Sequence, residues 1–440
     1  MSMTPLARAV ALAAISAGTI LPNLAHADFI KDSKGSLELR NFYFNRDFRQ
    51  EGGLASHKLP GATAGQSKAE EWAQGFLLRM ESGYTEGTVG FGVDALGLAG
   101  VKLDSSTDRS GTGLLPMGKD FNAPDSYGSL GLTGKIEVSK SVLKFGTLGT
   151  RVPVLQANDT RLLPQTFEGA QITVQEIKDL NLTAGHLRQI KDRNSTDYTD
   201  FAITTNAGRN IAKSAGGALN KGDDFNFAGA DYKFTSNLTG SYYYGNLADY
   251  YKQHFFGLVH TLPIAKGQSL KTDLRYFSSS EDGHRQVQDV DNRALMGMLT
   301  YSLGGHAFGL GYQQMNGNTG FPFLNAVTDP YLVNYVQIGN FSSAKEKSWQ
   351  ARYDYNFASI GLPGLTFMTR YVYGDNVELG AGRAEGKEWQ RNMDLGYVIQ
   401  SGPVKGLGLK WRNATYRSNF GKHSELDENR LILSYTLPLF

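Results

Sequence analysis

The feature that most constrains the fold is a series of segments, each about 10 residues long, in which apolar and polar residues alternate. Such segments occur along almost the whole chain, for example "SLELRNFYF" (36–44), "SLKTDLRYF" (269–277) and "SWQARYDYNF" (348–357). An alternation with a period of two residues indicates a β-strand with two chemically different faces. No longer stretch shows a convincing helical period, so the sequence predicts an all-β protein.

The connections between these segments alternate in length. Eighteen segments are separated by short gaps, such as 139–140 and 235–237, and by long gaps, such as 149–167 and 316–345. This is typical of a transmembrane antiparallel β-barrel with short periplasmic turns and long outer loops. A weak nineteenth segment, "DFAITTN" (200–206), would leave an odd number of strands. We therefore assign it to the fourth long loop.

The two faces of the strands distinguish a membrane barrel from a soluble β-protein. In 349–357 the odd-numbered residues are apolar or aromatic, and the even-numbered residues are polar or charged. A strand of this length can cross a bilayer when it is tilted, and aromatic residues near strand ends suit the membrane interfaces. The last strand ends at Phe440, which resembles the assembly signal of outer-membrane proteins. A soluble β-solenoid, the alternative, should show an internal repeat, and we find none.

The N-terminus predicts export. Residues 1–27 contain an apolar stretch (9–21) and the small-residue sequence "AHA" (25–27), as in a cleavable signal peptide. An N-terminal anchor helix is the less favoured alternative, because Pro22 and Asn23 follow the apolar stretch. Residues 28–440 would then form a single barrel domain.

Composition and motifs exclude several classes of function. The chain has no cysteine, which excludes disulfides and thiol chemistry, and its net charge of +2 argues against a nucleic-acid-binding protein. The eight histidines form no recognisable metal motif, and no nucleophile elbow or Walker loop is present. We therefore expect no cofactor, no bound metal and no enzymatic activity.

Strand alternation also selects cations that face the barrel lumen, because a charge on the lipid face would cost about 2–4 kcal/mol at the membrane midplane. The selected residues are Arg40, Lys135, Lys144, Lys271, Arg275, Arg352, Arg370, Lys410, Arg412 and Arg430.

A simple register places Arg412 diagonal to Arg430, so that these two and Lys410 cluster, with the strand of Arg40 closing beside them. The opposite wall is expected to carry acids, with Asp273, Asp354 and Asp394 as inward candidates. Alternatively, the charges pair across strands and only keep the lumen wet.

The sequence resembles the porin D (OprD) family of outer-membrane channels over essentially the whole mature chain. The resemblance is carried by "LELRNFYFNRDFR" (37–49), "EWAQGFLLRMESGYTEGTVGFGVDALGLAGVKLD" (71–104), "VPVLQANDTRLLPQTFEG" (152–169) and "KGLGLKWRNATYRSNF" (405–420). It implies an 18-stranded monomeric barrel, a third loop folded into the pore, and a basic ladder on the inner wall that conducts carboxylates.

The segment 149–167 is too apolar and too rich in proline for a solvated outer loop. By the resemblance it is the constriction loop, with Arg161 at the narrowest point and Asp159 among the acids that face the ladder. The alternative is that Asp159 and Arg161 pair with each other only to fix the loop.

We therefore expect passive diffusion of small carboxylate-bearing solutes, such as amino acids, dipeptides or organic acids. The expected partners besides these solutes are outer-membrane lipid, lipopolysaccharide and, through Phe440, the barrel assembly machinery. Three alternatives are an outer-membrane enzyme, a soluble secreted binding protein and an energised receptor. The receptor would need a large plug domain before its first strand, and here the first strand begins within ten residues of the cleavage site.

Overall fold

The structure is a computed structural model that describes residues 27–49, 65–205, 209–210, 222, 224–283, 290–325, 327–421 and 424–440. The expected signal peptide, apart from Ala27, lies outside the described residues. The described chain starts with a short helix, α2 (Ala27–Lys31), and the first strand follows from Lys34. No helix in these ranges has both the length and the apolar character needed to cross a membrane.

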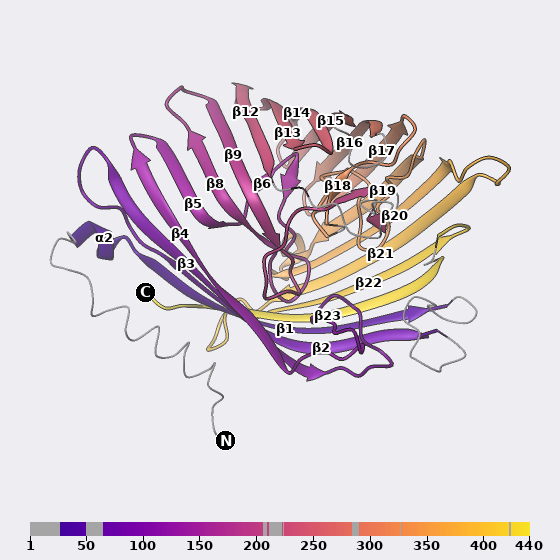
Figure 1. Ribbon diagram of the computed structural model, residues 1–440, viewed down its shortest axis with the longest axis horizontal. Coiled ribbons are helices and arrows are strands. Elements are labelled where there is room, and N and C mark those ends of the chain that lie inside the picture. The colour runs from indigo at the N-terminus through magenta and orange to yellow at the C-terminus, as the bar shows by residue number, and fades with distance from the viewer. Residues whose placement is uncertain are drawn as a thin grey trace.

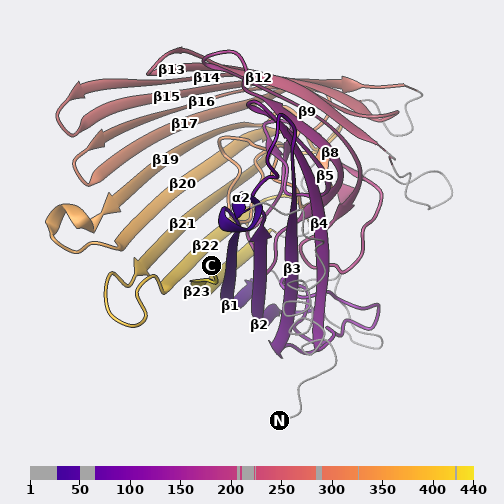
Figure 2. The same cartoon turned by 90° about the vertical axis from the view of Figure 1, so that its left-hand side faces the viewer.

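Eighteen antiparallel strands form a closed barrel, as the sequence predicted (Figure 1). Each strand pairs with its neighbours along the chain, and the first strand pairs with the last to close the wall, which Figure 2 shows from the side. The barrel strands are β1 (Lys34–Phe48), β2 (Lys68–Glu81), β3 (Gly90–Asp104), β4 (Ser126–Val138), β5 (Ser141–Leu148), β8 (Thr166–Val174), β9 (Leu180–Lys191), β12 (Phe225–Thr235), β13 (Leu238–Leu247), β14 (Tyr251–Ala265), β15 (Gln268–Glu281), β16 (Asp291–Leu303), β17 (His306–Asn316), β19 (Lys347–Asn356), β20 (Leu365–Val377), β21 (Gly386–Val398), β22 (Gly408–Ser418) and β23 (Glu425–Pro438).

The connections alternate between short and long, as expected. One of the short ones contains a single 3-10 turn, η2 (Phe357–Ile360). The described part of the weak segment at 200–206, residues 200–205, does not join the barrel wall. Its strand β10 (Ile203–Thr205) pairs instead with β11 (Arg209–Asn210) and β18 (Phe323–Leu324) in a small separate sheet, so its assignment to a loop is confirmed.

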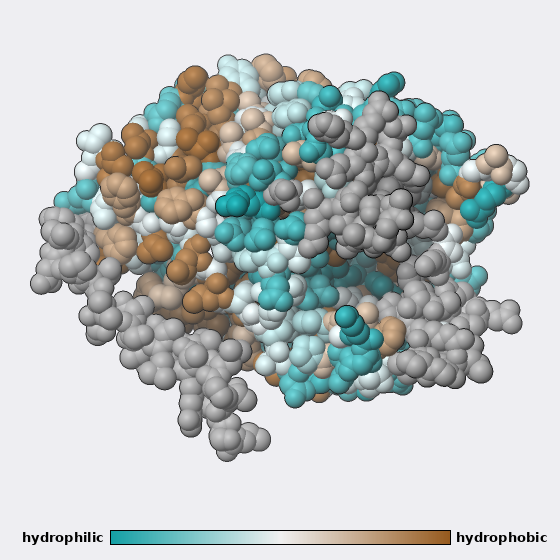
Figure 3. Space-filling model, in the orientation of Figure 1, coloured by the Kyte–Doolittle hydropathy of each residue, from teal (hydrophilic) through white to brown (hydrophobic). Residues whose placement is uncertain are grey.

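The two faces of each strand meet different surroundings. On β15, Leu274 points outward and is exposed, whereas Phe277 points inward and is fully buried. Figure 3 shows apolar surface gathered over the strands at the left of the view, where no grey segment covers them. The outward side chains thus suit a lipid environment, and the inward ones pack against loops inside the barrel.

Loop 3, residues 149–165, lies inside the barrel. It contains the small hairpin β6 (Arg151–Val152) and β7 (Leu155–Gln156), and β6 appears within the curve of the wall in Figure 1. Leu162 of this loop packs so closely on the inner face of β2 that a Cβ at Gly75 would lie 3.1 Å from it. The missing side chain at Gly75 therefore makes room for the loop.

Loop 7, residues 317–346, also lies against the inner wall where it is described (317–325 and 327–346), which the sequence did not predict. Three inward glutamines hold its main chain. The Gln313 amide donates to Phe341 O (2.6 Å), the Gln350 amide donates to Val333 O (3.1 Å), and Gln390 Oε1 accepts from two successive N–H groups of the loop at 3.2 and 2.7 Å. We call these three side chains the amide anchors.

Candidate functional site

Inward cations of the last strands and the first form a diagonal band on the inner wall. Arg352 on β19 lies directly opposite Arg370 on β20. Arg412 on β22 lies directly opposite Arg430 on β23. This pair is one inward position, or two residues, closer to the periplasmic end than the pair of Arg352 and Arg370. Lys410 on β22 and then Arg40 on β1 occupy the following inward positions toward the periplasmic end. Together with Arg161 of loop 3, these residues are called the basic band below.

The direct pairing of Arg412 with Arg430 corrects the expected diagonal placement. The loop after β22 closes so that Arg417 faces Glu425, and every pair further along the hairpin follows from that closing pair. Register depends on the geometry of the turn, which alternation within the strands does not reveal.

From the sequence we expected the acids to line the wall opposite the cations, but the structure places them beside the cations. Asp394 lies on β21 beside the band, where it accepts a hydrogen bond from Arg412 Nε (3.0 Å) and lies 3.6 Å from Lys410 Nζ. Asp354 forms an ion pair with Arg352 on the same strand at 2.7 Å. Asp273 lies on β15, away from these strands, and pairs with its own neighbour Arg275 (2.7 Å). The carboxylates therefore neutralise the nearest cations and do not face them across the lumen.

Arg370 differs from its neighbours in the band. Its Nε donates to the neutral Asn392 Oδ1 at 3.2 Å, and no carboxylate of the described residues forms an ion pair with it. It also lies between two other guanidinium groups, those of Arg352 and Arg412, whose like charges act on it. The charges of Asp394 and Asp354 act on it as well, but both of these carboxylates pair with other cations, so Arg370 has no carboxylate of its own among the described residues.

Three guanidinium groups surround the ring of Phe44, which faces inward from β1. Arg430, Arg161 and Arg46 place their central carbons 4.7, 4.8 and 5.3 Å from the ring centre. The face of an aromatic ring attracts cations, which helps the three like charges to share this space. The buried Glu428 carboxylate accepts from Arg430 Nε (2.6 Å) and Arg46 Nη2 (2.8 Å). We call these five residues the arginine cluster.

Loop 3 brings its charged residues to the basic band, and they do not form the internal Asp159–Arg161 pair that the sequence analysis had left open as an alternative. Asp159 pairs with Arg40 Nη1 at 2.7 Å, and Arg161 forms no ion pair with a carboxylate of the described residues. Arg161 is only 7 % exposed and donates to Thr160 O at 3.1 Å. Burial and the charge of Arg430 lower the pKa of Arg161, but a guanidinium retains its proton in proteins.

A further cation, Arg193, reaches this place from the loop that follows β9. Its Nη1 donates to Thr160 Oγ1 at 3.4 Å, and its buried Nε finds no hydrogen-bond partner among the described residues. Sequence reasoning missed both Arg193 and Arg46. Arg46 could have been found, because it shares the parity of Arg40 on one strand, whereas no pattern marks a single arginine in a long loop.

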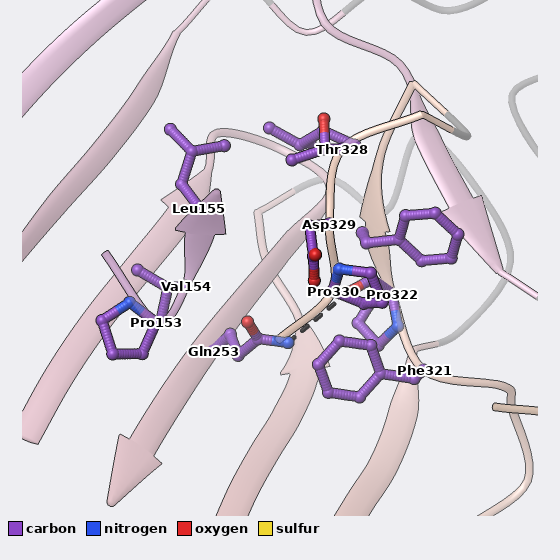
Figure 4. A pocket seen from close by; sticks show the side chains of 11 residues that line it. Pro153, Val154, Leu155, Gln253, Phe321, Pro322, Thr328, Asp329 and Pro330 are labelled. Carbon is purple, nitrogen blue, oxygen red and sulfur yellow. Dashed lines mark hydrogen bonds between the residues drawn. The ribbon is translucent and has the colours of Figure 1, made fainter. Parts of the chain in front are cut away.

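Loop 7 also reaches the arginine cluster. Gln337 donates to Glu428 Oε1 (2.8 Å), and Arg430 Nη2 donates to Gln337 O (3.3 Å). Loops 3 and 7 also meet each other at a small pocket. Figure 4 shows Pro153 and Val154 of loop 3 on one side of it, Asp329 and Pro330 of loop 7 on the other, and Gln253 of β14 between them. Both loops and the arginine cluster thus lie together inside the barrel.

Comparisons with known proteins agree with this architecture. The family model described as "outer membrane porin, OprD family" matches residues 27–439. Porin-like protein GalP of Pseudomonas putida is 40 % identical over 428 residues, covering 97 % of each chain. Porin D of Pseudomonas aeruginosa is 37 % identical and covers 93 % of this chain and 92 % of its own. The crystal structure of Pseudomonas aeruginosa OpdQ has 57 % identity and a TM-score of 0.83, covering 94 % of this chain and all of that one.

Proposed function

This chain belongs to the OprD family of outer-membrane porins, and from that premise we propose that small carboxylate-bearing solutes diffuse passively through it along the basic band. The protein is a channel of the bacterial outer membrane and not an enzyme. Amino acids, dipeptides and organic acids are the solutes that the proposal includes.

The observation that carries the proposal is an excess of positive charge in the band. Its seven cations are Arg40, Arg161, Arg352, Arg370, Lys410, Arg412 and Arg430. Only five carboxylates of the described residues form ion pairs with them, namely Glu38, Asp159, Asp354, Asp394 and Glu428. Arg161 and Arg370 pair with none of the five. A solute carboxylate would supply the missing negative charge, and a guanidinium can bind it through two parallel hydrogen bonds.

The exposure of the band favours passage over tight binding. Lys410 is 51 % exposed and Arg352 is 38 % exposed, so both can reach a solute, whereas Arg430 is 1 % exposed and acts through its field. Several weak sites in sequence allow an anion to enter and also to leave. We propose that Lys410 and Arg352 contact the solute, that the charge of Arg370 attracts it, and that the arginine cluster sets the potential at the constriction.

Reconstitution into planar bilayers tests this function. We expect the wild-type channel to be anion-selective, and we expect the double variant Arg370→Gln/Lys410→Gln to lose selectivity, measured as a shift of the reversal potential in a salt gradient toward zero. Arg391→Gln is the matched control. Arg391 is an exposed arginine on β21 that contacts only neutral side chains and shares the outward parity of Trp389, so its loss should leave selectivity unchanged. Unchanged selectivity in the double variant would refute the role of the band.

We further propose how the chain reaches and occupies the membrane. Residues 1–27 would be removed as a signal peptide, and residues 28–440 would fold as one domain. The ring of Phe440 packs over Gly35, where the first and last strands meet, and Leu439 N donates to Gly35 O at 2.8 Å. A signal read by the assembly machinery would thus end where the first and last strands close the barrel. We propose that the channel works as a monomer among lipids and lipopolysaccharide, since one chain builds the whole constriction.

A further inference from the structure

The end of loop 7 is attached to the barrel by a buried acid. Glu346 is 1 % exposed, and one of its carboxyl oxygens accepts a hydrogen bond from Ser343 N at 2.9 Å. The other oxygen points at the main chain of β20, where a Cβ on Gly374 would lie 2.3 Å from it. The glycine therefore leaves space for a carboxyl group that is enclosed by the wall and by its own loop.

A second buried acid meets the first one. Glu388 on β21 is 4 % exposed and accepts a hydrogen bond from Tyr416 Oη on β22 (2.6 Å). It lies directly opposite Gly374, the residue at which Glu346 Oε1 points, and this oxygen has no hydrogen-bond partner among the described residues, so the two carboxyl groups are placed to share a hydrogen bond. A hydrogen bond between two carboxyl groups requires a proton on one of them. Glu346 is the donor and Glu388 the acceptor, because burial and the charge of Glu388 raise the pKa of Glu346.

No described cation offsets the charge of this pair. The titratable groups that face it are Asp375 on β20 and Tyr416 on β22, and neither carries a positive charge. The amine of Lys345, the neighbouring residue of loop 7, pairs with the exposed Glu378 at 2.7 Å. Lys347, at the start of β19, has the outward parity of Trp349. Losing the shared proton would thus leave two adjacent like charges in a buried place.

We propose that Glu346 and Glu388 form a proton-operated latch, which holds loop 7 on the inner wall while they share a proton and releases the end of the loop when that proton leaves. The stabilisation is present at low pH and is lost as the pH rises through the raised pKa of Glu346. Because Gln337 of the same loop contacts Glu428 and Arg430, release of the latch loosens the constriction next to the arginine cluster. The channel should therefore open more often, or more widely, in alkaline medium.

This inference rests on the proposed function only in treating the constriction between loops 3 and 7 as the solute path. Single-channel recording from about pH 5 to about pH 9, a range that extends well above the usual pKa of a carboxyl group, tests it. We expect the wild-type conductance or open probability to rise with pH and the response of Glu346→Gln to be flat, because glutamine donates to Glu388 at every pH. The matched control Glu378→Gln removes an exposed acid at the same junction and should titrate like the wild type.

Labelling of an introduced thiol reports directly on the release of loop 7. The chain has no cysteine, so Ser342→Cys introduces a single thiol in the latched segment, at a side chain that is 1 % exposed and has no hydrogen bond to lose among the described residues. With a thiol-specific maleimide, we expect S342C to react at alkaline pH about tenfold faster than S342C/E346Q, the factor that corresponds to one pKa unit of coupling. The comparison at equal pH cancels the intrinsic pH dependence of the thiol.

Equal labelling rates in the two backgrounds, or an E346Q channel that titrates like the wild type, would overturn the latch. Reversal potentials measured in the same recordings report the proposed selectivity separately. A wild-type channel that shows the expected pH response but no anion selectivity would overturn the proposed function and not the latch.

Discussion

Replacing Glu428 by glutamine should destabilise the barrel strongly, although the two side chains have nearly the same shape. Glu428 is 0 % exposed and is the carboxylate of the arginine cluster, where it accepts from Arg46, Arg430 and Gln337. Glutamine has one acceptor oxygen and turns an NH₂ group toward donors that need an acceptor. It also leaves the guanidinium groups around Phe44 without their negative charge.

The size of the effect follows from the burial of the pair. Removing one partner of a buried ion pair costs about 3–5 kcal/mol, because the remaining charge stays buried and uncompensated. Part of this cost is relieved by the ring of Phe44, which retains its cation–π contacts. We therefore expect a loss of about 3 kcal/mol in the free energy of unfolding, measured by urea titration of the barrel folded into lipid vesicles.

The neighbouring residue on the same strand supplies the control. Asp427 also pairs with two arginines, Arg49 and Arg417, but on the outer face, where its carboxylate is 23 % exposed to solvent. Asp427→Asn should cost no more than about 1 kcal/mol, as is usual for exposed ion pairs. If Glu428→Gln cost as little as Asp427→Asn, the claim that the arginine cluster depends on its carboxylate would be refuted.

Two further variants address the attachment of loop 7. Gln390→Leu removes the acceptor of two successive loop N–H groups; we expect a loss of about 1–3 kcal/mol per unsatisfied donor and faster cleavage of the loop in limited proteolysis, and unchanged cleavage would contradict the anchoring role. Asp329→Asn retains the acceptor for Tyr331 N, and since burial raises the pKa of Asp329, the wild type should lose loop stability as the pH rises above the usual carboxyl range while this variant should not. Identical pH profiles of proteolysis in the wild type and Asp329→Asn would argue against a role of Asp329 in the stability of loop 7.

The wall of the barrel was predictable because each strand carries its own signal. The alternation in 348–357 separates a face with Trp349 from a face with Arg352, and the structure places these residues outside and inside as expected. Local periodicity cannot reveal which residues of two strands lie opposite each other. The pairing of Arg412 with Arg430 and the position of Asp394 beside them depend on turn closure and on neighbouring strands, and these were the parts that the sequence analysis placed wrongly.

The interior was less predictable than the wall. The apolar and proline-rich composition of 149–167 marked loop 3 as unusual, whereas loop 7 carries no comparable signal and was expected to be an outer loop. Its placement depends on glutamines of the wall that read as ordinary inward polar residues. The contacts of Arg161 with Phe44 and of Asp159 with Arg40 likewise join distant segments, and their residue types alone do not indicate such contacts.

The amide anchors have a consequence for how a channel of this kind can change its solute. Gln313 and Gln350 bind carbonyl oxygens of loop 7, which every residue type supplies, and Gln390 binds N–H groups, which every residue type except proline supplies. The loop is thereby fixed in place independently of most of its side chains. Substitutions at its pore-facing positions can accumulate during divergence without detaching it, and a designer could exchange those positions on an unchanged scaffold.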